Sequence, residues 1–89
     1  MDINVTIEVW RKGDLFIAKC PELDFISQGE TSEVAKKNLL EVISIQIEEM
    51  EEMGTLNDYL AECGYEKRND QIIPFTEMIG FEKHSLQLN

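Results

Sequence analysis

The sequence predicts an α+β domain with the order β-β-β-α-(α)-β, in which an antiparallel sheet carries one long helix packed on a face. Apolar and polar residues alternate with a period of two near the N-terminus, a turn containing glycine follows, and helical periodicity occupies the middle of the chain. With 89 residues and 43% hydrophobic content, the chain has room for one domain with one core. We therefore expect residues 1–89 to form a single domain.

The first two expected strands form a hairpin. In residues 3–9, β-branched side chains occupy every second position, which is typical of a strand with one face on the core. Gly13 can adopt the positive φ of a tight turn, and residues 15–20 form an apolar return strand in the centre of the sheet. Pro21 cannot donate to a ladder, so this strand ends there. A short third strand is expected over residues 25–28.

A long amphipathic helix is expected after the third strand. The hydroxyl oxygen of Thr31 or Ser32 can cap its first turn. Apolar residues then recur at helical spacing until Gly54, which indicates a stop or a bend. The apolar positions are Ala35, Leu39, Val42, Ile43, Ile47, Met50 and Met53. A second, shorter helix is expected over residues 55–63.

The last quarter of the chain gives weaker signals. Residues 66–75 begin with a charged run and are then interrupted by a proline, which predicts a connector. Apolar and polar residues alternate within residues 77–88, which predicts a final strand with Ile79 and Phe81 on one face. The alternation changes phase after these residues, as it does at a β-bulge.

Charge, hydropathy and cysteine usage limit the classes of function. Eighteen acidic residues against eight basic ones give a net charge of −10, and the basic residues are scattered along the chain. Direct nucleic-acid binding requires a concentrated basic patch, so we expect none, whereas an acidic surface suits a basic protein partner. No apolar run approaches the ~18 residues of a membrane span. Two cysteines outside any paired motif and the absence of a secretory leader predict a cytoplasmic protein.

We expect no enzymatic activity, no cofactor and no bound metal. His84 is the one histidine, and a lone base near the end of the chain does not make a nucleophile–base pair or a zinc site. The glutamates within residues 48–53 fan outward from a helix, whereas calcium ligands converge from a tight loop. A metal-dependent nuclease is an alternative that requires carboxylates to converge across strands, although nothing in their spacing demands it. Its candidate ligands are Asp14, Glu22, Asp24 and Glu30.

Residues 21–39 read PELDFISQGETSEVAKKNL. This stretch resembles the HicB-like antitoxin family, whose signature is a Pro-x-Leu segment, a Ser-Gln-Gly-acid-Thr turn, and a helix that starts with an acidic, alanine-containing turn. The matching residues are Pro21, Leu23, Ser27, Gln28, Gly29, Glu30, Thr31, Glu33 and Ala35. Gly29 permits a sharp turn, Thr31 caps the helix, and Ala35 is small where the helix meets the sheet. The resemblance covers residues 3–63.

The resemblance implies the toxin-neutralising half of such an antitoxin. In the family, this half is a degenerate ribonuclease-H-like domain that binds a small basic HicA-like toxin, an mRNA-cleaving protein, and covers its active site. Val34 stands where the family usually has a glutamate, so the reciprocal capping box is lost. Residues 66–89 are too few and too unlike helices to supply the family's DNA-binding module. If a toxin binds, we expect contacts from Glu22, Asp24 and Glu30, since acids in loops at a sheet end can reach a basic cleft.

A third hypothesis stands beside the antitoxin and the nuclease. The chain can be a stand-alone homo-oligomer with a structural or small-ligand-binding role. A domain of this size leaves much of its apolar surface exposed unless a partner covers it. We therefore expect a homodimer or a higher homo-oligomer.

Overall fold

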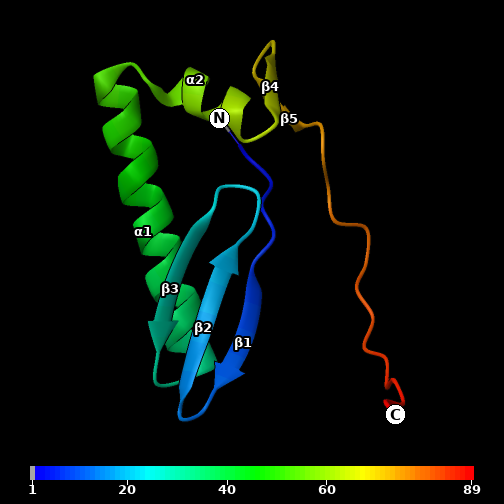
Figure 1. Cartoon of the computed structure of the whole chain (residues 1–89). Coiled ribbons are helices and arrows are strands. Elements are labelled where there is room, and N and C mark those ends of the chain that lie inside the picture. Colours follow the sequence, from blue (N-terminus) through cyan, green and yellow to red (C-terminus); the bar gives the residue numbers. More distant parts are fainter. Residues whose placement is uncertain (1) are drawn as a thin grey trace.

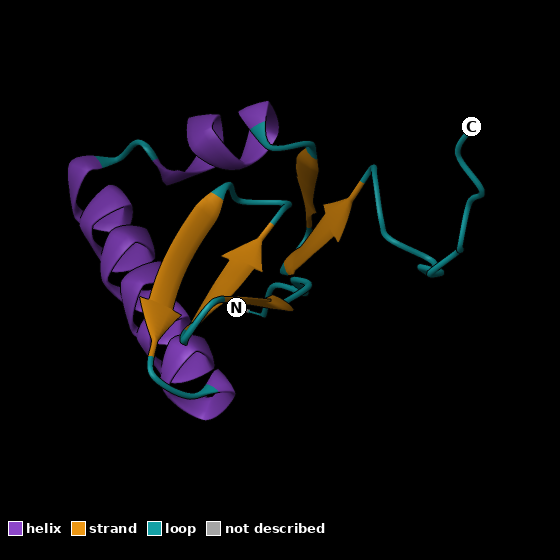
Figure 2. Ribbon diagram, turned by 60° about the horizontal axis from the view of Figure 1, so that its bottom comes forward, coloured by secondary structure: helices purple, strands orange, loops and turns teal. Residues whose placement is uncertain are grey.

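The computed structural model describes residues 2–89 and confirms the α+β class (Figure 1). The elements are β1 (Glu8–Lys12), β2 (Leu15–Cys20), β3 (Phe25–Gly29), α1 (Ser32–Met53), α2 (Leu56–Glu62), β4 (Tyr65–Arg68) and β5 (Gln71–Pro74). Strands β1, β2 and β3 form an antiparallel sheet in that order, and β4 and β5 form a separate hairpin. Helix α1 packs along one face of the three-stranded sheet, and α2 lies beyond the end of the sheet where α1 finishes (Figure 2).

The first strand is shorter than the alternation predicted, because β2 ends at Pro21. Glu8 pairs with Lys19, next to the last residue of β2, and residues 2–7 lie outside the ladder. Ile3, Val5 and Ile7 are instead partly buried against the core. Gly13 has the expected positive φ of 62° and forms the two-residue turn between the strands together with Asp14. The predicted hairpin is therefore confirmed, but its first strand begins at Glu8 and not at residue 3.

The expected helix caps are also confirmed. Thr31 caps α1 by accepting a hydrogen bond from the backbone N–H of Val34 at 3.1 Å, and Gly54 ends the helix in the left-handed region at a φ of 74°. Gly29 permits a close approach of β3 to α1, because a Cβ there would lie 2.7 Å from the backbone nitrogen of Ala35. This contact brings the buried face of α1 directly onto the sheet.

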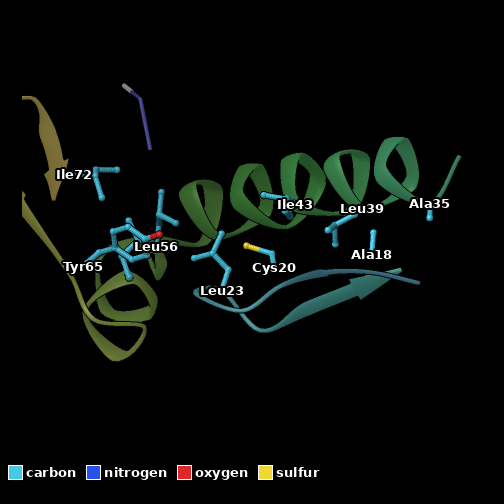
Figure 3. Close-up of a cluster of buried hydrophobic side chains, with 10 residues drawn as sticks. Ala18, Cys20, Leu23, Ala35, Leu39, Ile43, Leu56, Tyr65 and Ile72 are labelled. Atoms are coloured by element: carbon cyan, nitrogen blue, oxygen red, sulfur yellow. The ribbon is translucent and has the colours of Figure 1, made fainter. Parts of the chain in front are cut away.

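The core lies between the sheet and α1 and continues under α2 and the β4–β5 hairpin (Figure 3). Leu23, Ala35 and Leu39 are fully buried, which gives two residues of the Pro-x-Leu and alanine motif a packing role. The other core residues are Ala18, Cys20, Ile43, Leu56, Leu60, Tyr65 and Ile72. No helix among residues 2–89 combines the length and apolarity needed to cross a membrane.

Two predictions about the C-terminal quarter are wrong. Residues 66–75 were expected to be a connector, but most of them form the β4–β5 hairpin, in which Lys67 pairs with Ile72. The charged side chains of β4 are largely exposed while Tyr65 and Ile72 are buried, and Asn69 adopts the turn conformation with a φ of 56°. The expected final strand over residues 77–88 is absent, because no strand among residues 2–89 lies beside it to complete a ladder.

Candidate protein-binding surfaces

Glu22 lies in the loop between β2 and β3, and its carboxylate is committed to contacts within the chain. It accepts two 3.0 Å hydrogen bonds from the backbone N–H of Thr6 and a 2.6 Å hydrogen bond from the Thr6 hydroxyl. Burial raises the pKa of Glu22, but the hydrogen bonds from Thr6 outweigh that effect and leave the pKa below its usual value of 4.5. Glu22 therefore anchors the segment that precedes β1, and it is less free to contact a partner than the sequence suggested.

Asp24 ends the same loop and is exposed. It has a φ of 58°, a conformation that aspartate tolerates better than most residues. The loop is held from the other side by Tyr59 of α2, whose hydroxyl donates to the backbone carbonyl of Leu23 and whose ring stacks on Phe25 at 6.1 Å. Burial is the main cause that raises the pKa of Tyr59 to about 12, and the charge of Asp24 adds to it. Asp24 is thus an exposed acid at the junction of the sheet and α2.

Glu30 is exposed, but it lies at the opposite end of the sheet from Glu22 and Asp24. Cys20 pairs with Phe25 at one end of β2, and Phe16 pairs with Gly29 at the other, which separates the two ends by roughly 14 Å at 3.4 Å per residue. Asp14 lies in the β1–β2 turn at the same end as Glu30 (Figure 1). The three predicted contact residues are therefore not brought together, and the four candidate nuclease ligands fall into two separated pairs.

The nucleophilic and metal-ligating side chains show no activated arrangement within residues 2–89. Burial raises the pKa of the Cys20 thiol, and burial likewise raises the pKa of Cys63, so both favour the unreactive thiol form. His84 is exposed and lies 3.0 Å from the Glu82 carboxylate on the C-terminal segment. No group of three or more histidine, cysteine, aspartate and glutamate side chains in the described part of the chain could hold a metal ion.

No helix or strand among residues 2–89 covers the face of the sheet opposite α1. Directly paired residues of antiparallel strands share a face, so the register assigns one set of side chains to the side away from the helix. We call this set the open face: Glu8, Trp10, Lys12, Leu15, Ile17, Lys19, Ile26 and Gln28. Trp10 is 56% exposed, and Ile26 on the far strand is 60% exposed. Large apolar side chains that remain exposed on one surface mark a site of association.

Polar contacts hold the Trp10 ring in place on the open face. Its indole N–H donates to the Glu8 carboxylate at 3.0 Å, and the Lys19 ammonium lies 5.7 Å from the ring centroid. Such an ammonium interacts with the negative face of the ring. The tryptophan is therefore oriented before any partner arrives, which lowers the conformational entropy lost on binding.

Carboxylates gather at the end of the molecule where α1 finishes. Glu48, Glu49, Glu51 and Glu52 are exposed in the last turns of α1, and the last turn contains no basic residue. We call the following set the acidic end: Asp24, Glu48, Glu49, Glu51, Glu52, Asp58 and Glu62. Lys67 shares a hollow with Glu51, but none of the ion pairs found among residues 2–89 includes a member of the acidic end. Both the helix dipole and mutual repulsion disfavour negative charge there.

The hollows of the described surface do not suggest a small-molecule site. A hollow of about 170 Å³ lies between α1, α2 and β5, below the roughly 300–1,000 Å³ of typical ligand pockets. A larger one, of about 700 Å³, is lined by α1 alone on its solvent side, from Glu33 to Ile45. A surface formed by one helix is a shallow face that cannot enclose a ligand.

Sequence reasoning missed the open face, although the signal was present. Residues 15–20 are apolar on both faces, which predicted a strand covered on both sides. The chain supplies one long helix, and one helix covers one face of a sheet, so the other face had to remain open unless a partner covers it. Trp10 and Ile26 are the residues that this argument would have identified.

Comparison with known proteins found no relative of this chain. None of the protein-family models, curated proteins or solved structures compared with the chain matches it.

Proposed function

We propose that this chain is a HicB-like antitoxin or a binding protein derived from one, which neutralises a small basic HicA-like mRNA-cleaving toxin by covering its active site. The resemblance of residues 21–39 to that family motivates the proposal, and the order of three strands followed by a long helix is compatible with it. Inhibition of this kind requires a surface and no catalytic group.

The observation that carries the proposal is the acidic end. Exposed carboxylates accumulate at the C-terminal end of α1, where the helix dipole favours cations. A basic partner would relieve this repulsion and would be steered to the surface by complementary potential. A ribonuclease is a suitable partner, because a protein that binds the phosphates of RNA presents a basic cleft.

Co-expression tests the proposal. The chain is expressed with any small basic protein that is encoded beside it, and both growth rescue and co-purification are measured. We expect the toxic effect to be relieved and the two proteins to purify together. If neither happens, the antitoxin proposal fails.

A pair of charge variants tests the role of the acidic end. Replacing Glu48, Glu49, Glu51 and Glu52 with glutamine removes four charges there and should weaken toxin binding by roughly tenfold or more, mainly through slower association. The matched control removes four exposed charges outside the acidic end, by amide substitution of Asp14, Glu33, Glu41 and Glu77. The control should bind nearly as the natural chain does. Equal losses in both variants would show that net charge matters and the acidic end does not.

A second candidate function, a stand-alone homo-oligomer, is favoured by the open face. Trp10 and Ile26 expose apolar surface that a second copy could cover as well as a toxin could. Sedimentation of the isolated chain distinguishes the two: a stable oligomer that blocks toxin binding supports this candidate, whereas a complex with the toxin supports the antitoxin. The hollow of about 170 Å³ gives no support to a small-ligand role.

A further inference from the structure

The C-terminal segment, residues 75–89, extends away from the folded part of the chain (Figure 1). The radius of gyration is 15.6 Å, compared with roughly 12 Å for a compact domain of this length. Large apolar side chains are exposed along it, with Ile79 at 94% and Phe81 at 82%. Apolar and polar residues alternate along the segment as they do in a strand, but no strand among residues 2–89 pairs with it.

The sheet offers one matching free edge. Strands β1 and β3 are both terminal in the sheet order. The edge of β3 is partly covered by α1, because the Asn38 side chain donates to the backbone carbonyl of Gln28 at 2.9 Å. Within residues 2–89 no strand pairs with the outer edge of β1. Unpaired N–H and C=O groups on an edge strand can accept another strand.

The side chains of the segment fit β1 best in an antiparallel register. With Phe81 opposite Trp10, the aromatic rings pair on the open face and Lys83 faces Glu8. On the other face, Glu82 becomes a diagonal neighbour of Arg11. A parallel arrangement with the same aromatic pair would place Lys83 against Lys12, so the charges select the antiparallel direction.

The direction of the segment makes a second copy the source of this strand. After β5 the segment runs toward the same end of the molecule as β1 does (Figure 1). Folding back within one chain would therefore give the parallel pair with its lysine–lysine clash. A second copy related by a two-fold axis perpendicular to the strands presents its own segment to β1 in the antiparallel sense, and the exchange is reciprocal.

We propose that residues 79–83 of one copy add as an antiparallel strand to the free edge of β1 in a second copy, with Phe81 against Trp10 and Lys83 against Glu8. The dimer packs the exposed Phe81 ring against Trp10 and gives the sheet of each copy a fourth strand. It also extends the open face by the Phe81 ring.

Sedimentation velocity over a range of concentrations tests the proposal on the full chain. We expect a species of twice the 10.3 kDa monomer mass, with a dissociation constant raised roughly tenfold or more by Phe81→Ser. Leu86→Ser is the matched control, because Leu86 is also 82% exposed in the same segment but lies outside the register. Equal weakening by both variants, or a monomer at every concentration, overturns the proposal.

A charge exchange tests the register itself. Lys83→Glu should weaken the dimer by placing two carboxylates together, and combining it with Glu8→Lys, which also removes the acceptor of the Trp10 indole N–H, should recover part of that loss. Trp10 is the one tryptophan in the chain, so its emission should shift to shorter wavelength as the dimer forms. The same shift in a monomer would indicate closure within one chain and would overturn exchange between copies.

Discussion

The central sheet and the C-terminal segment carry similar alternations of apolar and polar residues, but they differ in what surrounds them. The sheet has β2 pairing on both sides and α1 on one face, so the side chains of Ala18 and Cys20 are completely buried. Residues 77–88 have no neighbouring strand within the described chain, and Ile79 stays 94% exposed. An alternating pattern therefore selects the residues that could form a strand, and the neighbours determine whether the strand forms.

The largest expected change in stability comes from comparing the same substitution at one leucine of each region. Leu39 is fully buried between α1 and the sheet, whereas Leu86 is 82% exposed in the C-terminal segment. Leu39→Ala should lower the free energy of unfolding by roughly 2–5 kcal/mol, because it removes buried methyl groups and leaves a cavity. Leu86→Ala should change it by less than about 0.5 kcal/mol. Urea unfolding of dilute protein measures both, and a large loss in Leu86→Ala would show that the segment packs on the domain.

A smaller loss of stability is expected when the hydrogen bonds between Glu22 and Thr6 are weakened. Glu22→Gln replaces a carboxylate that accepts three hydrogen bonds from Thr6 and should cost roughly 1.5–3 kcal/mol at neutral pH. The pKa of Glu22 is lowered by folding, so its stabilising contribution is present above the unfolded value of 4.5 and is lost as the pH falls through the folded value. The difference between the natural chain and the variant should therefore shrink in acid. A difference that is constant with pH would contradict the role of the carboxylate charge.

Much of the fold could be predicted because its signals are local. The turn glycine, the proline that ends β2, the Thr31 cap and the apolar stripe of α1 act within a few residues of where they lie in the sequence. Those elements were found nearly in place. The β4–β5 hairpin was missed because burial of Tyr65 and Ile72 depends on α2 and on the segment before β1. Such support is not visible in a short charged stretch.

The candidate surfaces could be predicted less well, because they depend on which ends and faces meet. The sequence placed Glu22, Asp24 and Glu30 in loops, but loop membership does not say that Glu30 lies at the other end of the sheet. It also does not reveal that the carboxylate of Glu22 is occupied by Thr6. The acidic run at the end of α1 was visible, and its proximity to α2 and Asp24 required the fold.

The smallest expected loss of stability concerns the hydrogen bond between Tyr65 and Asn4. This bond ties the β4–β5 hairpin to the N-terminal segment, whereas residues 75–89 extend away from the folded part of the chain (Figure 1). The Tyr65 hydroxyl donates to the backbone carbonyl of Asn4 at 2.7 Å, and Tyr65 is 3% exposed. Tyr65→Phe keeps the ring in the core and removes one hydrogen bond, so it should lower the free energy of unfolding by about 1 kcal/mol. Burial raises the pKa of Tyr65 to about 12 from 10.0, so the hydroxyl stabilises the fold below pH 10 and that contribution is lost as the pH rises toward 12. Urea unfolding at neutral and alkaline pH measures the stability of both chains, and the natural chain should lose its greater stability over the variant in alkali. A difference in stability that persists in alkali would show that the hydrogen bond to Asn4 is not what ties the hairpin to the N-terminal segment.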